Sequence, residues 1–271
     1  MMQKVITIER SRGMNRLISN MTWKEYRDKV ENGILILPVG STEQHGPHLP
    51  LGVDTIIATQ FSLAIAREVN AVVAPTVSYG YKSLPASGGG PMFPGTIDLN
   101  GSTLTSLVYD LLKEFVADGW KQILIFSAHY ENEAFLSEAC DLLLRNQTEE
   151  FPKVLICNWW DNLSAETVSR VFDEVKFPGW ALEHAAISET SLMMHLSPEL
   201  VNEDLITDDG MVSPPTYQSF PPSKSLIPAT GCLHSARSSS AEKGKLIVED
   251  ATKTIVSFLK KEFSLDLVTF K

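Results

Sequence analysis

Two short polar clusters carry side chains that can ligate a divalent cation. The first pairs Glu43 with His45 and is followed by Asp54, and the second pairs His129 with Glu131. Residues two apart in an extended segment point to the same side, so each pair can reach one point. Mixed carboxylate and imidazole donors favour Zn²⁺ or Mn²⁺, and their number suits two ions better than one. These residues predict a centre of two divalent cations, with Asp54 as the expected bridging carboxylate.

Each cluster also has a structural interpretation that stays open. A histidine at the end of a strand is often only a hydrogen-bonded surface residue, and either cluster alone would fit that description. Two such clusters, each directly behind an apolar run, favour the metal centre instead. His48, between Pro47 and Leu49, is predicted to have a structural role or to contact the metal ligands without binding the metal itself.

The elements that must position these clusters are short buried strands. Apolar runs precede both clusters, at residues 34–39 and 121–127, and similar runs lie at residues 71–77 and 154–158. Helical patterns separate or follow them at residues 55–70, 102–118, 131–146 and 239–263. This alternation predicts an α/β fold, with a mostly parallel sheet flanked by helices on both faces in a single domain. Ligand sites in such sheets lie at the carboxyl ends of the strands, which places both clusters at one edge.

Three further expectations concern the organisation of the chain. Residues 1–20 read as an N-terminal extension, and residues 21–271 as one domain. Asp54 stands where it could cap the helix predicted at residues 55–70. The Pro- and Ser-rich residues 212–228 are expected to form a surface loop.

Composition excludes several classes of protein. A chain of 271 residues that is 44% hydrophobic can bury a sizeable core. Its formal charge of −10 provides no basic surface for a phosphate backbone, so nucleic acid is not an expected partner. Three widely spaced cysteines fit neither a disulfide framework nor a zinc knuckle. This cysteine usage is typical of a reducing compartment, so a cytoplasmic location is expected. No signal peptide and no apolar run of roughly 18 residues is found, so membrane anchoring is not expected.

From about residue 22 to residue 263 the chain resembles the creatininase (creatinine amidohydrolase) family. The EQHG motif with a following Asp is shared across the wider family, whereas HYEN, YGYKS and SGGG indicate the creatininase branch. The matching segments are TWKEY (22–26), LPVGSTEQHG (37–46), YGYKS (79–83), SGGG (87–90), FPGT (93–96), HYEN (129–132), WD (160–161), GW (179–180), EH (183–184) and ETSLM (189–193).

The resemblance implies two divalent metal ions per subunit, Zn²⁺ and/or Mn²⁺. Many members of the wider family have Gly where Glu131 stands. Glu189 is therefore an alternative metal ligand, or a residue that contacts the ligands without binding the metal. With Glu131 preferred, the implied ligands are Glu43, Asp54 and His129 for one ion and His45, Asp54 and Glu131 for the other.

The resemblance also implies an activity, the reversible opening of the cyclic amide of creatinine to creatine by a hydroxide that bridges the metals. His184 would be the general acid, and Glu183 would orient it or contact the substrate. Residues implied to line the substrate pocket are Ser87, Tyr130, Trp160 and Trp180. Trp23, Trp120 and Trp159 are assigned to the core instead. Family members are commonly hexameric, so a homo-oligomer that binds a small-molecule substrate is expected.

Departures from the family pattern keep other functions open. Ala181 stands where creatininases carry Asp, and Ala185-Ala186 where they carry Gly-Gly. The alternative is therefore a hydrolase of another small amide or cyclic substrate, such as a formamide or a keto-inositol. A third hypothesis is a non-catalytic protein that binds metal and a ligand, which the presence of His184 argues against.

Overall fold

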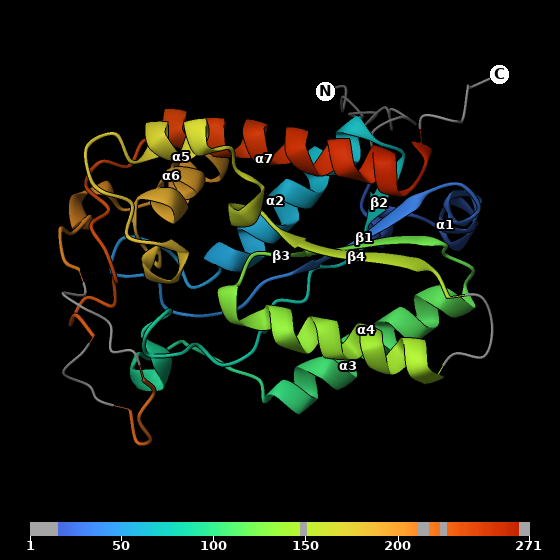
Figure 1. The fold of residues 1–271 in the computed structure, drawn as a ribbon, viewed down its shortest axis with the longest axis horizontal. Helices are drawn as coiled ribbons and strands as arrows, with labels where there is room; N and C mark the ends of the chain where they lie inside the picture. Colours follow the sequence, from blue (N-terminus) through green and yellow to red (C-terminus); the bar gives the residue numbers. More distant parts are fainter. Residues whose placement is uncertain (1–15, 147–150, 211–216, 223–226, 266–271) are drawn as a thin grey trace, which may run out of the picture.

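The centre of the computed structural model is a parallel sheet with strand order β2-β1-β3-β4 (Figure 1). The structure describes residues 16–146, 151–210, 217–222 and 227–265. The strands are β1 (Ile34–Val39), β2 (Ala71–Val73), β3 (Gln122–Ser127) and β4 (Lys153–Asn158). The predicted α/β class with a parallel sheet is confirmed.

The strands are apolar along their length because helices cover both faces of the sheet. All six residues of β1 are buried, and Ile36 pairs with Val73 on one side and Leu124 on the other. β2 is shorter than the predicted run at residues 71–77. Pro75 has no amide hydrogen to donate to a neighbouring strand, and only Val77 beyond it forms a bridge, to Val39.

Helices form a layer on each face of the sheet (Figure 1). Phe61 of α2 stacks on Phe126 of β3 within one hydrophobic core, and Val108 of α3 lies in the core on the other face. The first layer contains α2 (Val53–Glu68), α5 (Ala165–Val171), α6 (Ile187–Leu196) and α7 (Ala241–Glu262). The second contains α3 (Gly101–Ala117) and α4 (Glu133–Asn146), with α1 (Trp23–Val30) at the end of the sheet.

Two helix starts differ from the sequence-based predictions, and one buried helix was not predicted. The N-cap of α2 is Gly52, and Asp54 lies inside the first turn, so the expectation that Asp54 caps the helix is wrong. A 3₁₀ turn, Tyr130–Asn132, precedes α4. The sequence analysis did not predict α6, because its first seven residues are all buried and it therefore lacks an amphipathic pattern.

The described part of the predicted N-terminal extension is held against β2. Arg16 Nη1 donates to Val69 O and Ala71 O at 3.2 and 3.1 Å, and Leu17 pairs with Val73. Of the predicted loop at residues 212–228, residues 212–216 and 223–226 lie outside the described residues.

The tryptophans assigned to the core divide into two groups. Trp120 and Trp159 are buried as predicted, but the prediction for Trp23 is wrong, because 66% of it is exposed. The charged groups of Lys24 and Arg27 lie over its ring, 5.5 and 5.2 Å from the centroid, which provides polar partners for an aromatic side chain in water.

No helix formed by the described residues is both long enough and apolar enough to cross a membrane.

Loops at the carboxyl edge of the sheet approach one another closely. The Asn132 side chain donates to Gly40 O at 3.1 Å and accepts from Tyr81 N at 2.8 Å. Gly40 lies so close to the first turn of α2 that a Cβ there would be 2.6 Å from Thr55 N. This contact needs glycine, and it places Asp54 beside the end of β1.

Candidate active site

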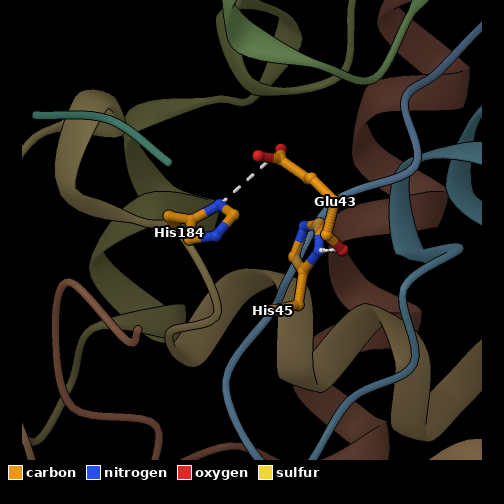
Figure 2. A group of neighbouring side chains, drawn as sticks. All are labelled: Glu43, His45 and His184. Atoms are coloured by element: carbon orange, nitrogen blue, oxygen red, sulfur yellow. Dashed lines mark hydrogen bonds and ion pairs between the residues drawn. The ribbon is translucent and has the colours of Figure 1, made fainter. Parts of the chain in front are cut away.

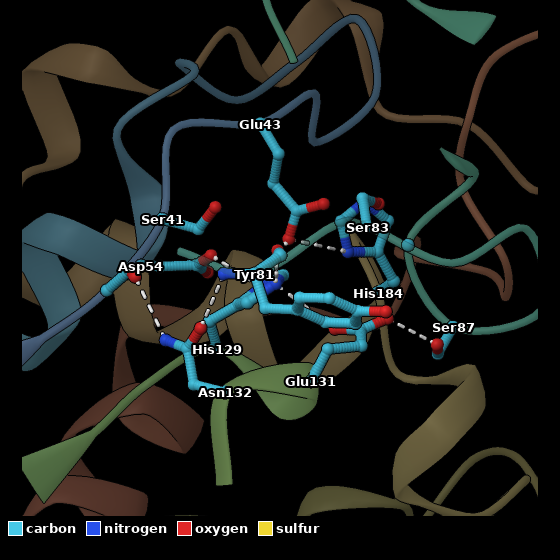
Figure 3. Close-up of polar contacts among 12 residues, drawn as sticks. Ser41, Glu43, Asp54, Tyr81, Ser83, Ser87, His129, Glu131, Asn132 and His184 are labelled. Atoms are coloured by element: carbon cyan, nitrogen blue, oxygen red, sulfur yellow. Dashed lines mark hydrogen bonds and ion pairs between the residues drawn. The ribbon is translucent and has the colours of Figure 1, made fainter. Parts of the chain in front are cut away.

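The first group of potential ligands combines residues from the loops that follow β1 and β3 with one residue of α2 (Figure 3). His129 Nδ1 lies 2.9 Å from Glu43 Oε1 and 3.2 Å from Asp54 Oδ2. All three side chains are almost completely buried, and their donor atoms lie within 4.8 Å of one another. We call these residues the His129 cluster.

The second group, which we call the His45 cluster, contains His45, Asp54 and Glu189. His45 Nε2 lies 3.2 Å from Asp54 Oδ1 and 3.5 Å from Glu189 Oε2. Asp54 therefore directs one carboxylate oxygen to each cluster, which is the arrangement a bridging ligand requires.

Glu131 is the predicted ligand that the structure does not bring into the His45 cluster. Its Oε2 lies 3.3 Å from His129 Nε2, whereas the His129 cluster uses Nδ1 of the same ring. Its Oε1 accepts hydrogen bonds from Leu84 N and from the Ser87 hydroxyl (Figure 3). Glu189 occupies the position expected for Glu131, and it comes from α6.

The electrostatics of the clusters fit divalent cations. Glu43 Oε2, His45 Nε2 and Asp54 Oδ2 are buried and make no hydrogen bond, which is costly unless another partner satisfies them. Burial lowers the pKa of His45, but the Glu189 and Asp54 carboxylates outweigh it and raise that pKa well above its usual value. The cluster therefore attracts positive charge, and its nitrogen and oxygen donors suit Zn²⁺ or Mn²⁺.

His184 lies next to both clusters, just before α6 (Figure 2). Its ring centroid is 4.4 Å from that of His45, and its Nδ1 is 3.9 Å from Glu43 Oε1. Burial lowers the pKa of His184, which favours the neutral imidazole. With Glu43 and His45 it forms a third group whose donor atoms lie within 4.8 Å.

A cavity of about 30 Å³ opens beside the clusters, with room for about two water molecules. Tyr130 is 46% exposed, and its ring lies 5.8 Å from that of Trp160. Trp159, which the sequence analysis assigned only to the core, also lines the cavity. The four residues predicted to line the substrate pocket surround this space, as does Glu183, which was expected to orient His184 or contact the substrate; the four are Ser87, Tyr130, Trp160 and Trp180.

The family model for creatininase, described as creatinine amidohydrolase, matches residues 19–259. The chain belongs to the creatininase family. It is 39% identical over 252 residues to creatinine amidohydrolase of Pseudomonas putida, covering 91% of this chain and 96% of that protein. It is also 31% identical over 183 residues to the mycofactocin precursor peptide peptidase of Mycolicibacterium smegmatis, covering 65% of this chain and 61% of that protein.

Solved creatininase structures have the same fold. One described as "Creatininase Mn" has a TM-score of 0.89 and 38% identity, covering 92% of this chain and 99% of that one. A mutant creatininase of the "Zn-Zn type" has the same TM-score and 37% identity, covering 92% and 98%. This creatininase-family protein is thus a hydrolase of the class that acts on C–N bonds.

Glu183 of this creatininase-family protein has a role that the sequence did not indicate. Its Oε2 accepts hydrogen bonds from Ser188 N at 2.9 Å and from Ser188 Oγ at 2.7 Å, at the start of α6. Its Oε1 is buried and makes no hydrogen bond. Burial raises the pKa of Glu183 to about 8, with the hydrogen bonds from Ser188 opposing the shift.

The raised pKa of Glu183 predicts a pH-dependent stability in the metal-free creatininase-family protein. The folded state takes up a proton at Glu183 between about pH 4.5 and 8, so its stability falls as pH rises through this interval. Glu183→Gln removes the group whose deprotonation lowers the stability of the folded state, and its amide oxygen still accepts the hydrogen bonds from Ser188. Its Tm should therefore exceed that of the wild type at about pH 9 by more than it does at about pH 5.

Thermal unfolding followed by circular dichroism from acidic to alkaline pH measures this difference. Glu242→Gln is the matched control, because Glu242 is an exposed glutamate in the first turn of α7, and it should retain the wild-type pH dependence. Equal pH dependence in Glu183→Gln and the wild type would contradict the assignment.

Proposed function

We propose that this protein is a metal-dependent amidohydrolase that interconverts creatinine and creatine. The observation that carries the proposal is the position of Asp54, which faces His45 with one oxygen and His129 with the other. His184 and an aromatic-walled cavity lie beside this pair of clusters. The 39% identity to creatinine amidohydrolase of Pseudomonas putida supports the choice of substrate.

Two divalent cations, Zn²⁺ and/or Mn²⁺, are the proposed cofactors. Bound there, they would polarise the substrate carbonyl and make hydroxide available at neutral pH. We assign Glu189 rather than Glu131 to the second ion, because only Glu189 lies with His45 and Asp54. The proposed ligands are Glu43, Asp54 and His129 for one ion and His45, Asp54 and Glu189 for the other.

Glu131 has a proposed positioning role at the first ion. A ligating histidine usually donates its second ring N–H to a carboxylate or a carbonyl, which fixes the ring. His129 Nε2 lies 2.9 Å from Tyr81 O and 3.3 Å from Glu131 Oε2. Glu131 also accepts the Ser87 hydroxyl hydrogen bond and so holds one wall of the cavity.

His184 is the proposed proton-transfer group. Because burial favours its neutral form, the imidazole can first take a proton from the attacking water. It can then return that proton to the ring nitrogen of the substrate as the C–N bond breaks.

The aromatic walls of the cavity suit the proposed substrate. Creatinine is flat and can carry positive charge, which suits the aromatic faces of Trp160 and Trp180. The small cavity implies that wall side chains move when substrate enters.

Glu189→Gln should release the ion of the His45 cluster and leave the ion of the His129 cluster in place. Glu131→Gln should keep the ion at the His45 cluster, because Glu131 is not part of that cluster and lies instead against Nε2 of His129. Anomalous diffraction at the zinc edge resolves the two positions in crystals of each variant. An ion retained at the His45 cluster in Glu189→Gln but lost in Glu131→Gln would reverse the assignment.

An assay of creatinine and creatine interconversion by the protein loaded with Mn²⁺ or Zn²⁺ tests the proposed activity. Turnover in both directions, with two ions bound, supports it. Absence of turnover despite two bound ions would exclude creatinine and direct the search to other substrates.

A second candidate is hydrolysis of another small amide or cyclic compound. It is favoured by Ala181, in the 3₁₀ turn Trp180–Leu182 at the cavity, because the family resemblance places a carboxylate there. Ala181→Asp should improve creatinine turnover if creatinine already fits the cavity.

The third hypothesis, a non-catalytic binding protein, makes a different prediction. Such a protein would bind metal and ligand without turnover of any substrate.

We also propose a cytoplasmic homo-oligomer, a hexamer by family resemblance. Sedimentation equilibrium of the purified protein tests the assembly, and a monomer would contradict it.

A further inference from the structure

Gln44, between the ligands Glu43 and His45, joins three backbone segments around the site. It is 5% exposed, and its Nε2 donates to Gly88 O and Gly231 O, each at 3.0 Å. Its Oε1 accepts from Gly46 N at 2.9 Å. One neutral side chain therefore connects its own loop to the glycine-rich loop of the cavity and to a segment before α7.

These partners fix the orientation of the Gln44 amide. The two carbonyls can only accept, so the nitrogen must face them, and the Gly46 amide can only donate, so the oxygen must face it. The backbone of Gly231 lies so close that a Cβ there would be 2.1 Å from Gln44 Oε1. Both amide hydrogens of Gln44 are thus directed at backbone carbonyls.

The same residue determines which nitrogen of His184 carries hydrogen. His184 Nε2 lies 2.7 Å from Gln44 O and 2.9 Å from Gln44 Nε2. The carbonyl oxygen can only accept, and the hydrogens of Gln44 Nε2 are already used by Gly88 and Gly231. His184 Nε2 therefore carries the hydrogen and donates it to Gln44 O. Nδ1 is left unprotonated, and it is the nitrogen that faces Glu43 (Figure 2).

We propose that Gln44 is a positioning residue that fixes the orientation and tautomer of His184. Its side chain holds the loop, and its carbonyl holds the Nε2–H of His184. Nδ1 is then the atom that takes the proton from water and passes it to the leaving nitrogen, while Nε2 keeps its hydrogen throughout. The inference rests on the proposed role of His184 in proton transfer.

The tautomer can be measured without any substrate. Long-range ¹H–¹⁵N spectra of the zinc-loaded protein, labelled with ¹⁵N-histidine, distinguish a protonated from an unprotonated ring nitrogen, and His184→Gln assigns the signal. We expect a protonated Nε2 and an unprotonated Nδ1 at neutral pH. A wild-type His184 protonated at Nδ1 alone would overturn the inference, whichever substrate the enzyme uses.

Gln44→Met tests the contribution of the side chain. It removes all three side-chain hydrogen bonds at similar size, so the loop should shift and both tautomers of His184 should appear. We expect kcat to fall about 10- to 100-fold with KM changed less than about threefold, because His184 is displaced while the aromatic walls formed by Trp160 and Trp180 remain. Both ions should stay bound.

Gln122→Met is the matched control, since the Gln122 side chain donates to Phe263 O at the opposite end of β3. It should leave the tautomer and kcat unchanged. An unchanged tautomer and kcat in Gln44→Met, or loss of both ions together with a large fall in Tm, would refute the positioning role. If Gln44→Met does not fold, the wild-type spectrum alone still decides which nitrogen is protonated.

Discussion

Asp54→Asn should abolish hydrolysis and leave at most one tightly bound cation per chain. Asp54 is the residue shared by both clusters, with one oxygen 3.2 Å from His45 Nε2 and the other 3.2 Å from His129 Nδ1. Burial raises the pKa of Asp54, but His45 and His129 outweigh it and hold that pKa well below its usual value. Asparagine has similar size but no charge, so it cannot neutralise two cations.

We expect kcat/KM to fall at least about a thousandfold, because a bound metal contributes several kcal/mol to a hydrolytic transition state. Activity and metal content by atomic absorption should be measured on the same samples. Asp161→Asn is the control, as Asp161 follows the end of β4 and does not line the cavity. Two ions retained in Asp54→Asn would show that Asp54 is not a shared ligand.

His184→Gln should lose activity while keeping both ions. Proton transfer by a positioned side chain contributes about 10²- to 10⁴-fold, and kcat should fall by that factor. Glutamine cannot accept and return a proton near neutral pH. His184 lies outside the proposed ligand sets, so metal content should equal that of the wild type.

His195→Gln provides the comparison, because His195 is an exposed histidine near the end of α6 and should be dispensable. Single-turnover kinetics separate the chemical step from substrate binding. Parallel loss of one ion and of activity in His184→Gln would instead identify His184 as a ligand, as its proximity to Glu43 and His45 allows.

The sequence predicted the edge of the sheet at which the site lies, for a physical reason. Parallel strands that are covered on both faces must be apolar throughout, so polar residues directly behind them mark their carboxyl ends. This rule places Glu43, His45 and His129 at that edge from the sequence alone. Asp54 was included as a ligand, although its place inside the first turn of α2 was not foreseen.

Glu131 shows the limit of the same reasoning, because it does reach His129 but at Nε2 of the ring and not in the His45 cluster. The prediction that His129 and Glu131 point to the same side assumed an extended backbone. His129 is extended, but Tyr130–Asn132 forms a 3₁₀ turn, in which residues two apart point in different directions. Glu189 remained ambiguous because α6 is buried on nearly all sides and gives no periodic pattern from which its orientation could be inferred.

Gln44 was not found from the sequence at all. A neutral amide is neither a metal ligand of choice here nor a titratable group, and its three partners are backbone atoms of Gly46, Gly88 and Gly231. The place of Gln44 in the EQHG motif, between Glu43 and His45, was a signal, but residue type alone did not indicate its contacts.

The close approach at Gly40 limits how this scaffold can diversify. Because the loop after β1 lies directly against the backbone of Asp54 and Thr55, nearly any side chain there would displace the shared ligand. New substrates are then most accessible through changes on the cavity wall that includes Trp180, because none of the residues of the turn Trp180–Leu182 is buried. Natural variation and directed evolution should therefore concentrate on that wall, with Gly40 remaining intolerant of replacement.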